Sequence, residues 1–227
     1  MQIVTTIQPC DKKAVNGLKA PINDKWSKMS LQAKCDLISF HWKKLIFEAG
    51  RTPIVDDFVK AAFSTLREWL CQSQKRWLFL VGHCGTGKTL IARAVVNAYN
   101  HANYSPYGNN GENKFRITDA FSLFESLDVS KDNSAYDIFR TSPKLFIDDI
   151  GSEPPMAKIY GTDRNAVSEI LQYRYAQNLP TIITSNLTIY SENGKSQIEE
   201  FYGARIIDRL REMSYVIGFS GESFRKR

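Results

Sequence analysis

The hydrophobic pattern of the first third of the chain predicts two helices. Apolar residues recur every three or four positions over residues 31–45, which indicates a helix with Ser30 as its N-cap. The apolar face of a second helix covers residues 55–70, with Thr52 as the expected N-cap and Pro53 as the first helical residue.

Short, continuous apolar runs alternate with helical stretches in the rest of the chain. Such runs are typical of strands buried on both faces of a parallel sheet, with helices on each side. We expect five strands, at residues 77–82, 114–118, 144–148, 181–185 and 215–219. We expect helices at 90–99, 119–127 (capped by Asp119), 163–177 and 202–213, and loops at 100–113 and 151–162. The pattern therefore predicts an α/β fold.

Composition allows one sizeable core and argues against several protein classes. The chain has 227 residues, of which 43% are hydrophobic. No apolar run approaches the roughly 20 residues that a membrane span needs, and the first residues do not resemble a signal peptide, so we expect a cytoplasmic protein without a membrane partner. The four cysteines are scattered, which favours reduced thiols over disulfides or a zinc module.

The charge leans toward the N-terminal part of the chain. The formal net charge is +6, and residues 1–60 carry 10 Lys and Arg against 6 Asp and Glu. This suits nucleic acid, but it equally suits a solvated lysine-rich face. Residues 1–29 show no period, and we expect a loosely attached arm. We divide the chain into an N-terminal arm and helix (1–50), as a candidate partner- or DNA-binding region, and an α/β domain (51–227).

Residues 82–89 read GHCGTGKT and match the phosphate-loop pattern G-x-x-x-x-G-K-[ST] between an expected strand and an expected helix. Glycines let successive backbone N–H groups converge on a phosphate at a helix N-terminus. The lysine reaches the β- and γ-phosphates of ATP, and the hydroxyl of the following threonine binds Mg²⁺. His83 and Cys84 occupy variable positions and are interpreted as spacers. The candidate nucleotide-binding residues are Gly82, Gly85, Thr86, Gly87, Lys88, Thr89 and Leu90.

The apolar strand at 144–148 ends in two consecutive carboxylates, Asp148 and Asp149. Asp148 is a candidate Mg²⁺ ligand, and Asp149 can orient and deprotonate a water that attacks the γ-phosphate. Read alone, the pair also fits a polar strand end at a turn, but behind a matched phosphate loop the catalytic interpretation is favoured.

Two further polar residues have both a catalytic and a plain structural interpretation. Asn186 follows the strand at 181–185 and can touch both the γ-phosphate and the attacking water, or it can be an ordinary turn residue. Arg205 and Arg209 share a helix face and either form a solvated basic helix or reach the γ-phosphate of a neighbouring subunit.

The ordered set of motifs resembles a known ATPase family. GHCGTGKT, KLFIDDIG, PTIITSNL, YGARIIDRL and the final GFSGESFRKR look like the DnaC/DnaI/IstB type of AAA+ ATPase, over about residues 54–227. These are bacterial and phage helicase loaders and transposition helper ATPases.

The resemblance implies a fold and site roles. It implies the additional-strand P-loop NTPase (AAA+/ASCE) sheet with strand order 5-1-4-3-2 and little or no C-terminal lid. Asp148 and Asp149 become the Walker B pair, Asn186 sensor 1, and Arg205 an arginine finger that acts in trans; Arg225 is a weaker match to sensor 2. Asp149 stands where many relatives have Glu, so we expect slow hydrolysis.

The resemblance also implies partners, namely single-stranded DNA, self-assembly on it and a replicative helicase. Candidate DNA contacts are the 100–113 loop, with Tyr104 and Tyr107 as stacking residues, and the N-terminal lysines. The helix at 31–48, with Phe40 and Phe47, either docks on the helicase or packs on its own domain.

The leading hypothesis is an ATP-hydrolysing helicase loader that assembles on single-stranded DNA. The alternatives are an IstB-like transposition helper with a transposase partner, a P-loop kinase of a small metabolite, and a binding module with an inactive nucleotide site. The intact Lys88, Thr89, Asp148 and Asp149 argue against the last.

Overall fold

The computed structural model of the chain describes residues 24–71, 75–104, 114–127, 134–159, 162–191 and 194–219. The strands in these ranges are β1 (Trp77–Gly82), β2 (Arg116–Asp119), β3 (Leu145–Ile150), β4 (Ala157–Ile159), β5 (Thr162–Arg164), β6 (Thr181–Ser185) and β7 (Ser214–Phe219). The helices are α1 (Lys25–Lys28), α2 (Leu31–Glu48), α3 (Asp57–Cys71), α4 (Lys88–Ala102), α5 (Ala120–Glu125), α6 (Ser134–Thr141), α7 (Ala166–Ala176), α8 (Gln197–Tyr202) and α9 (Ala204–Met213). Among the described residues, no helix is both long enough and apolar enough to cross a bilayer.

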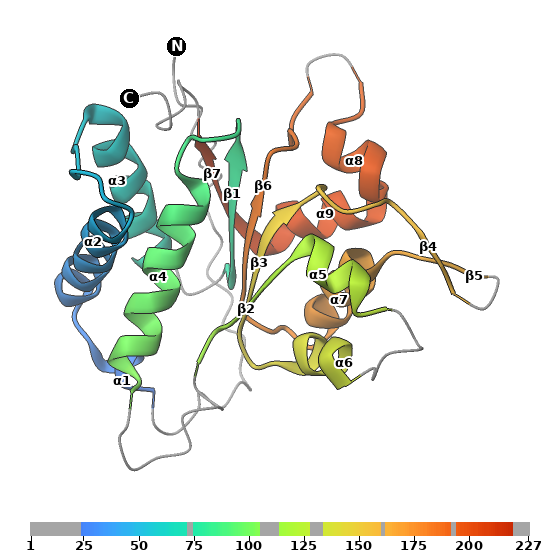
Figure 1. The fold of residues 1–227 in the computed structure, drawn as a ribbon, viewed down its shortest axis with the longest axis horizontal. Coiled ribbons are helices and arrows are strands. Elements are labelled where there is room, and N and C mark those ends of the chain that lie inside the picture. The colour runs from blue at the N-terminus through green and yellow to red at the C-terminus, as the bar shows by residue number, and fades with distance from the viewer. Residues whose placement is uncertain are drawn as a thin grey trace.

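A parallel sheet of five strands in the order β7-β1-β6-β3-β2 forms the centre of the molecule (Figure 1). Numbered along the chain over these five strands, the order is 5-1-4-3-2, which confirms the topology that the resemblance implies. β6 lies between β1 and β3, so the carboxyl ends of all three strands meet at one edge of the sheet.

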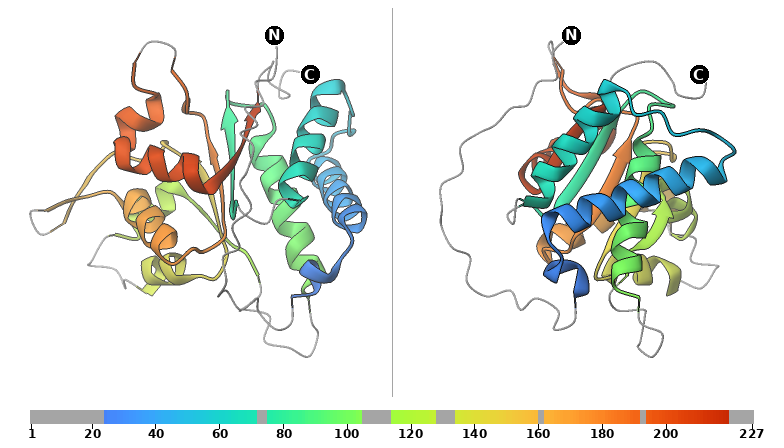
Figure 2. Two further views of the ribbon diagram at one scale, coloured as in Figure 1. Left: turned by 180° about the vertical axis from the view of Figure 1, so that it is seen from behind. Right: turned by 90° about the vertical axis from the view of Figure 1, so that its left-hand side faces the viewer.

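Helices cover both faces of the sheet (Figures 1 and 2). Apolar residues of α2, α3 and α4 share one core with Leu78 and Leu80 of β1. Apolar residues of α5 to α9 share the other core with Trp77 and Phe79 of the same strand. Because successive strand residues point to opposite faces, the central strands are buried on both sides.

The N-terminal helices pack on the outside of α4. Ile38 and Trp42 of α2 are buried in the same core as α4, and α2 crosses α4 (Figure 2, right). α1 packs on α4 through Trp26, whose ring centre lies 5.6 Å from that of Tyr99. The expectation of a loose arm is therefore wrong for residues 24–29, and residues 1–23 lie outside the described part. The domain boundary at residue 50 stays a prediction.

The caps of the N-terminal half are partly confirmed. The side chain of Ser30 accepts the N–H of Ala33, as expected. The expected start of the second helix at Thr52 and Pro53 is wrong, because α3 begins later, where the Asp56 carboxylate accepts the N–H of Val59 at 2.9 Å. A carboxylate that can reach the first-turn N–H groups fixes the start of the helix.

Three segments of the C-terminal half also differ from expectation. The expected loop at 151–162 contains β4, which pairs antiparallel with β5 in a short hairpin. The helix expected from residue 163 therefore begins only with α7, capped by Asn165. The helix expected at 202–213 begins as α9 after Gly203, whose φ of +84° separates it from α8. Strands of three residues are too short to show an alternating pattern.

We expect Gly82→Ala to lower the free energy of unfolding by about 2 kcal/mol or more. A Cβ atom there would lie 2.0 Å from the carbonyl oxygen of Phe219, and the φ of Gly82 is +146°. Gly218→Ala on β7 is the matched control, because nothing lies within 4 Å of its added Cβ atom. Urea denaturation measures both variants, and equal stabilities would contradict this close approach of β7 to the loop.

Candidate nucleotide-binding site

The phosphate loop connects β1 to α4 and opens the helix without a side-chain cap. Gly85 and Gly87 have φ values of +82° and +91°, a backbone conformation that favours glycine. Gly87 is the N-cap of α4 and makes no side-chain cap bond, so the first-turn N–H groups are available to an anion. The buried Thr86 donates to the carbonyl of His83 at 2.8 Å, and Leu90 is half-buried against the core.

The ammonium group of Lys88 lies at the mouth of this loop. It donates to the backbone carbonyls of Gly82 and His83 and to Oδ1 of Asn186, each at 2.8 Å. Lys88 is 5% exposed. Because Asn186 follows β6, the position of β6 beside β1 brings the sensor candidate into contact with the phosphate-loop lysine.

A β-bulge presents the two acidic residues of β3. Ile147 pairs with Ile183, whereas Ile150 pairs with Ser185, so β3 holds one extra residue between these pairs. Asp149 has a φ of +57°, which is uncommon for a residue other than glycine. In a regular strand, neighbouring side chains point to opposite faces, whereas a bulge turns one of them round. The bulge explains why both carboxylates bond to residues at the same edge.

The hydroxyl group of Thr184 supports this bulge. It donates to Oδ1 of Asp148 at 2.6 Å and accepts the backbone N–H of Asp149 at 2.8 Å. Thr184 is 1% exposed, so water does not compete for these bonds. The sequence gives no motif for it, since Thr184 looks like one more β-branched residue of a buried strand.

The donor atoms around Asp148 fit a magnesium–phosphate site. The hydroxyl of Thr89 donates to Oδ1 of Asp148 at 2.8 Å, and Arg93 lies 3.9 Å from Oδ2. Hydroxyl and carboxylate oxygens are the ligands that Mg²⁺ prefers. Next to them, Nδ2 of Asn186 donates to Oδ1 of Asp149 at 2.6 Å. The structure thus brings together Lys88, Thr89, Asp148, Asp149 and Asn186, whose individual roles stay predictions.

Comparison with known proteins agrees with this geometry. The model of a family described as IstB-like ATP binding protein matches residues 58–227. The match includes the phosphate loop, the bulge and Asn186. The chain belongs to this IstB-like family.

Solved structures and curated proteins that are similar to the IstB-like chain include helicase loaders. The crystal structure of the DnaC helicase loader is 25% identical, with a TM-score of 0.53 over 74% of this chain and 93% of that one. A crystal structure of DnaI has 23% identity and a TM-score of 0.54 over 86% and 93% of the two chains, and so supports the fold. The replicative helicase loader DnaI of Bacillus subtilis (strain 168) is 27% identical over 75% of this chain, which spans 52% of that protein. The phage-like element PBSX protein XkdC of the same organism is 26% identical over 79% of this chain and 67% of its own length.

The arginines of the IstB-like chain separate into different environments. Arg205 is exposed in the first turn of α9 and makes no hydrogen bond or ion pair with any described residue. The structure therefore does not connect it to the phosphate edge, the edge of the sheet where Lys88, Thr89, Asp148, Asp149 and Asn186 meet. Arg209 instead stacks on Tyr175, with the guanidinium carbon 4.7 Å from the ring centre. Arg225 lies outside the described residues. Of the two arginines expected to share a face, Arg205 is the one available to another molecule.

A buried carboxylate connects the bulge to the helix pair that carries Arg205. Glu153 is 4% exposed and accepts the N–H of Gly151 at 2.8 Å and the hydroxyl of Tyr202 at 2.5 Å. Tyr202 ends α8, directly before Gly203. Burial raises the pKa of Glu153 above its usual 4.5, although the Tyr202 bond opposes the shift. Glu153 stands in a segment expected to be a loop and was not predicted as a site residue.

We expect Thr184→Val to lower the rate of ATP hydrolysis about tenfold or more and to raise the Mg²⁺ concentration required, because Asp148 and Asp149 lose a shared hydrogen-bond partner. Thr184→Ser keeps the hydroxyl group and should retain most activity. Thr65→Val, which removes a hydroxyl on α3, is the control. Hydrolysis measured against Mg²⁺ tests this, and equal activity of the Val and Ser variants would contradict the role of the hydroxyl.

We expect wild type to lose stability relative to Glu153→Gln as the pH rises from about 4 to 7. The folded chain holds the Glu153 proton more tightly than the unfolded chain, so this contribution is present below the ordinary pKa of 4.5 and is lost as the pH rises through the raised one. Urea unfolding across this range measures it, with the exposed Glu125→Gln as control. A stability of wild type relative to Glu153→Gln that stays constant, or increases, as the pH rises would contradict the raised pKa.

Proposed function

We propose that this IstB-like chain is an ATPase of the helicase-loader type, in which ATP binding and slow hydrolysis switch its assembly on single-stranded DNA. The phosphate edge carries the proposal, since Lys88, Thr89, Asp148, Asp149 and Asn186 come from three strand ends and contact one another. Bound Mg²⁺ would polarise the phosphates, with Thr89 and Asp148 as its protein ligands.

The residues have distinct roles in this proposal. Lys88 and the N–H groups of the loop hold the β- and γ-phosphates. Asp149 accepts a proton from the attacking water, and Asn186 orients Asp149 through the 2.6 Å bond while it contacts Lys88. The short side chain of Asp149 supports a slow reaction, which suits a switch better than a motor.

The exposed position of Arg205 supports completion of the site by a neighbouring subunit. An arginine finger supplied by another molecule stabilises the charge of the transition state. Hydrolysis would then depend on assembly of the subunits. Because the subunits assemble on DNA, hydrolysis would signal that the loader is in place.

The N-terminal helices supply a candidate surface for the replicative helicase. α2 buries Ile38 and Trp42 against its own domain, while Phe40 and Phe47 are 56% and 67% exposed. One side of the helix thus packs against its own domain, while two large apolar residues stay on the surface. DnaI is described as a helicase loader, which supports this partner.

The family description supports a second candidate, a transposition helper that acts with a transposase on target DNA. Duplex DNA, rather than single strands, would then stimulate hydrolysis. The kinase hypothesis has no such support, because the chain belongs to the IstB-like family.

We expect Lys88→Ala to abolish ATP binding and Arg205→Ala to leave ATP binding intact while it removes the stimulation of hydrolysis by single-stranded DNA. Wild-type turnover should rise with protein concentration and with DNA, and the stimulation should weaken with salt. ATP binding and hydrolysis are measured separately over a range of protein concentrations.

Arg67→Ala on the exposed surface of α3 is the control for Arg205→Ala and should behave as wild type. Weaker ATP binding by monomeric Arg205→Ala would contradict a role in trans. Wild-type hydrolysis that ignores both protein concentration and DNA would contradict the assembly switch.

A further inference from the structure

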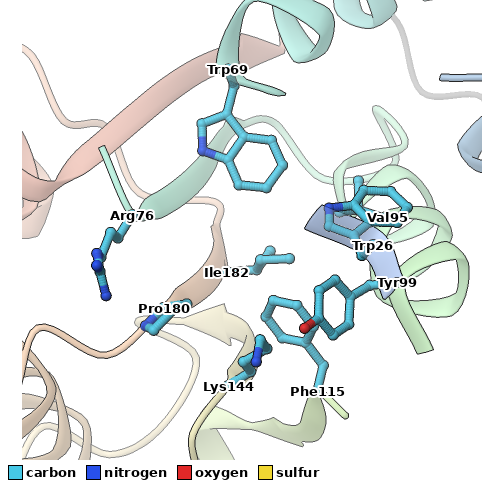
Figure 3. Close-up of a pocket in the computed structure, with 9 residues that line it drawn as sticks. All are labelled: Trp26, Trp69, Arg76, Val95, Tyr99, Phe115, Lys144, Pro180 and Ile182. Carbon is cyan, nitrogen blue, oxygen red and sulfur yellow. The ribbon is translucent and has the colours of Figure 1, made fainter. Parts of the chain in front are cut away.

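A cavity of about 170 Å³ lies at the amino ends of the strands of the parallel sheet, and Figure 3 shows its lining residues. Four of its lining residues directly precede strands of the parallel sheet: Arg76, Phe115, Lys144 and Pro180 precede β1, β2, β3 and β6. Because the phosphate loop follows the carboxyl end of β1, this cavity is separate from the nucleotide-binding site.

Aromatic side chains from four different segments surround the cavity. These side chains lie around Ile182 of β6 (Figure 3). They belong to Trp26 of α1, Trp69 of α3, Tyr99 of α4 and Phe115. Tyr99 packs on Trp26 and on Phe115 with interplanar angles of 55° and 89°, so the rings present faces in several directions. An exposed aromatic face favours a planar ligand, since any base can stack on it. A cavity of about 150 Å³ holds benzene, so this volume matches a single six-membered ring.

Two donors that line the cavity make no hydrogen bond of normal geometry with the described residues. The hydroxyl of Tyr99 is buried and makes no hydrogen bond of normal geometry, although the Asp24 carboxylate lies nearby. The ammonium of Lys144 lies 5.1 Å from the centre of the Tyr99 ring and has no hydrogen bond or ion pair within the described part of the chain. Lys144 is 8% exposed, so few water molecules reach its donors and they are available to a ligand that enters the cavity.

Charged groups distinguish the inner end of the cavity, at Tyr99 and Lys144, from its rim, at Arg76. Burial lowers the pKa of Lys144, and the carboxylate of Asp24 acts in the opposite direction. The inner end therefore suits neutral carbonyl oxygens better than an anion. Arg76 is half-buried at another side of the cavity and donates to the carbonyl of Asn178 at 3.2 Å. Its guanidinium group has five donors, which leaves capacity for a phosphate.

We propose that this cavity binds one thymine or uracil nucleotide, with the base against the aromatic side chains, the ring carbonyls accepting from Tyr99 and Lys144, and the phosphate at Arg76. The volume matches the base alone, so the sugar and phosphate lie at the open side of the cavity, and the two fused rings of a purine exceed it. The nucleotide is either free or part of single-stranded DNA, and only the DNA case rests on the proposed function.

Calorimetric titration of the full chain tests the proposal, with thymidine monophosphate and adenosine monophosphate as probes. A non-hydrolysable ATP analogue with Mg²⁺ first saturates the phosphate loop. Thymidine monophosphate should bind about tenfold more tightly than adenosine monophosphate. Tyr99→Phe and Lys144→Met should each weaken it about fivefold, because each removes one hydrogen bond. The exposed Lys60→Met is the control, and basal ATP hydrolysis should not change in these variants.

Equal binding of the two monophosphates, or thymidine monophosphate binding that neither variant changes, would overturn the proposal even when DNA stimulates ATP hydrolysis. Fluorescence anisotropy with short oligo(dT) and oligo(dA) then separates the two sources. A preference for oligo(dT) that falls in Tyr99→Phe identifies DNA as the ligand. Selective binding of the free nucleotide without an oligo(dT) preference supports the cavity with a free nucleotide, and this result does not depend on the helicase-loader function.

Discussion

One hydroxyl group supports the geometry of the phosphate edge. Thr184 bonds to the carboxylate of Asp148 and to the backbone N–H of Asp149, and it is almost completely buried. Both bonds require β6 to lie directly beside β3, as the strand order provides. Without a local partner, the left-handed backbone of Asp149 would be costly, since such conformations persist only where their surroundings fix them. The sheet topology therefore positions not only the strands but also the acidic pair.

The same central strand connects the phosphate-loop lysine to the carboxylate of Asp149. Asn186 follows β6 and bonds to Lys88 on one side and to Asp149 on the other. A γ-phosphate that draws the lysine ammonium toward itself would take away the donor that bonds to Oδ1 of Asn186. On the other side of the bulge, Glu153 joins Gly151 to the end of α8. The phosphate edge thus has a hydrogen-bonded route toward the helix that carries Arg205.

The sequence predicted the features that depend on local pattern. The buried strand of residues 77–82, the N-cap Ser30 and the phosphate loop follow from periodicity, side-chain capping and glycine spacing, and the resemblance supplied the strand order. The sequence did not predict the bulge, because the residues Asp148 and Asp149 alone do not show toward which face of the sheet each carboxylate points. Nor did it predict Thr184 or Glu153, whose importance comes from partners 36 and 49 positions away. The hairpin of β4 and β5 was missed because three-residue strands carry no readable pattern.

The link from Lys88 through Asn186 to Asp149 can be observed directly by nuclear magnetic resonance of the side-chain amide of Asn186, assigned with an Asn186→Ala variant. A non-hydrolysable ATP analogue with Mg²⁺ should shift this resonance, and ADP with Mg²⁺ should leave it close to its nucleotide-free position, because only the former places a γ-phosphate beside Lys88. Equal shifts with both nucleotides, or no shift with either, would contradict a sensor that responds to the γ-phosphate.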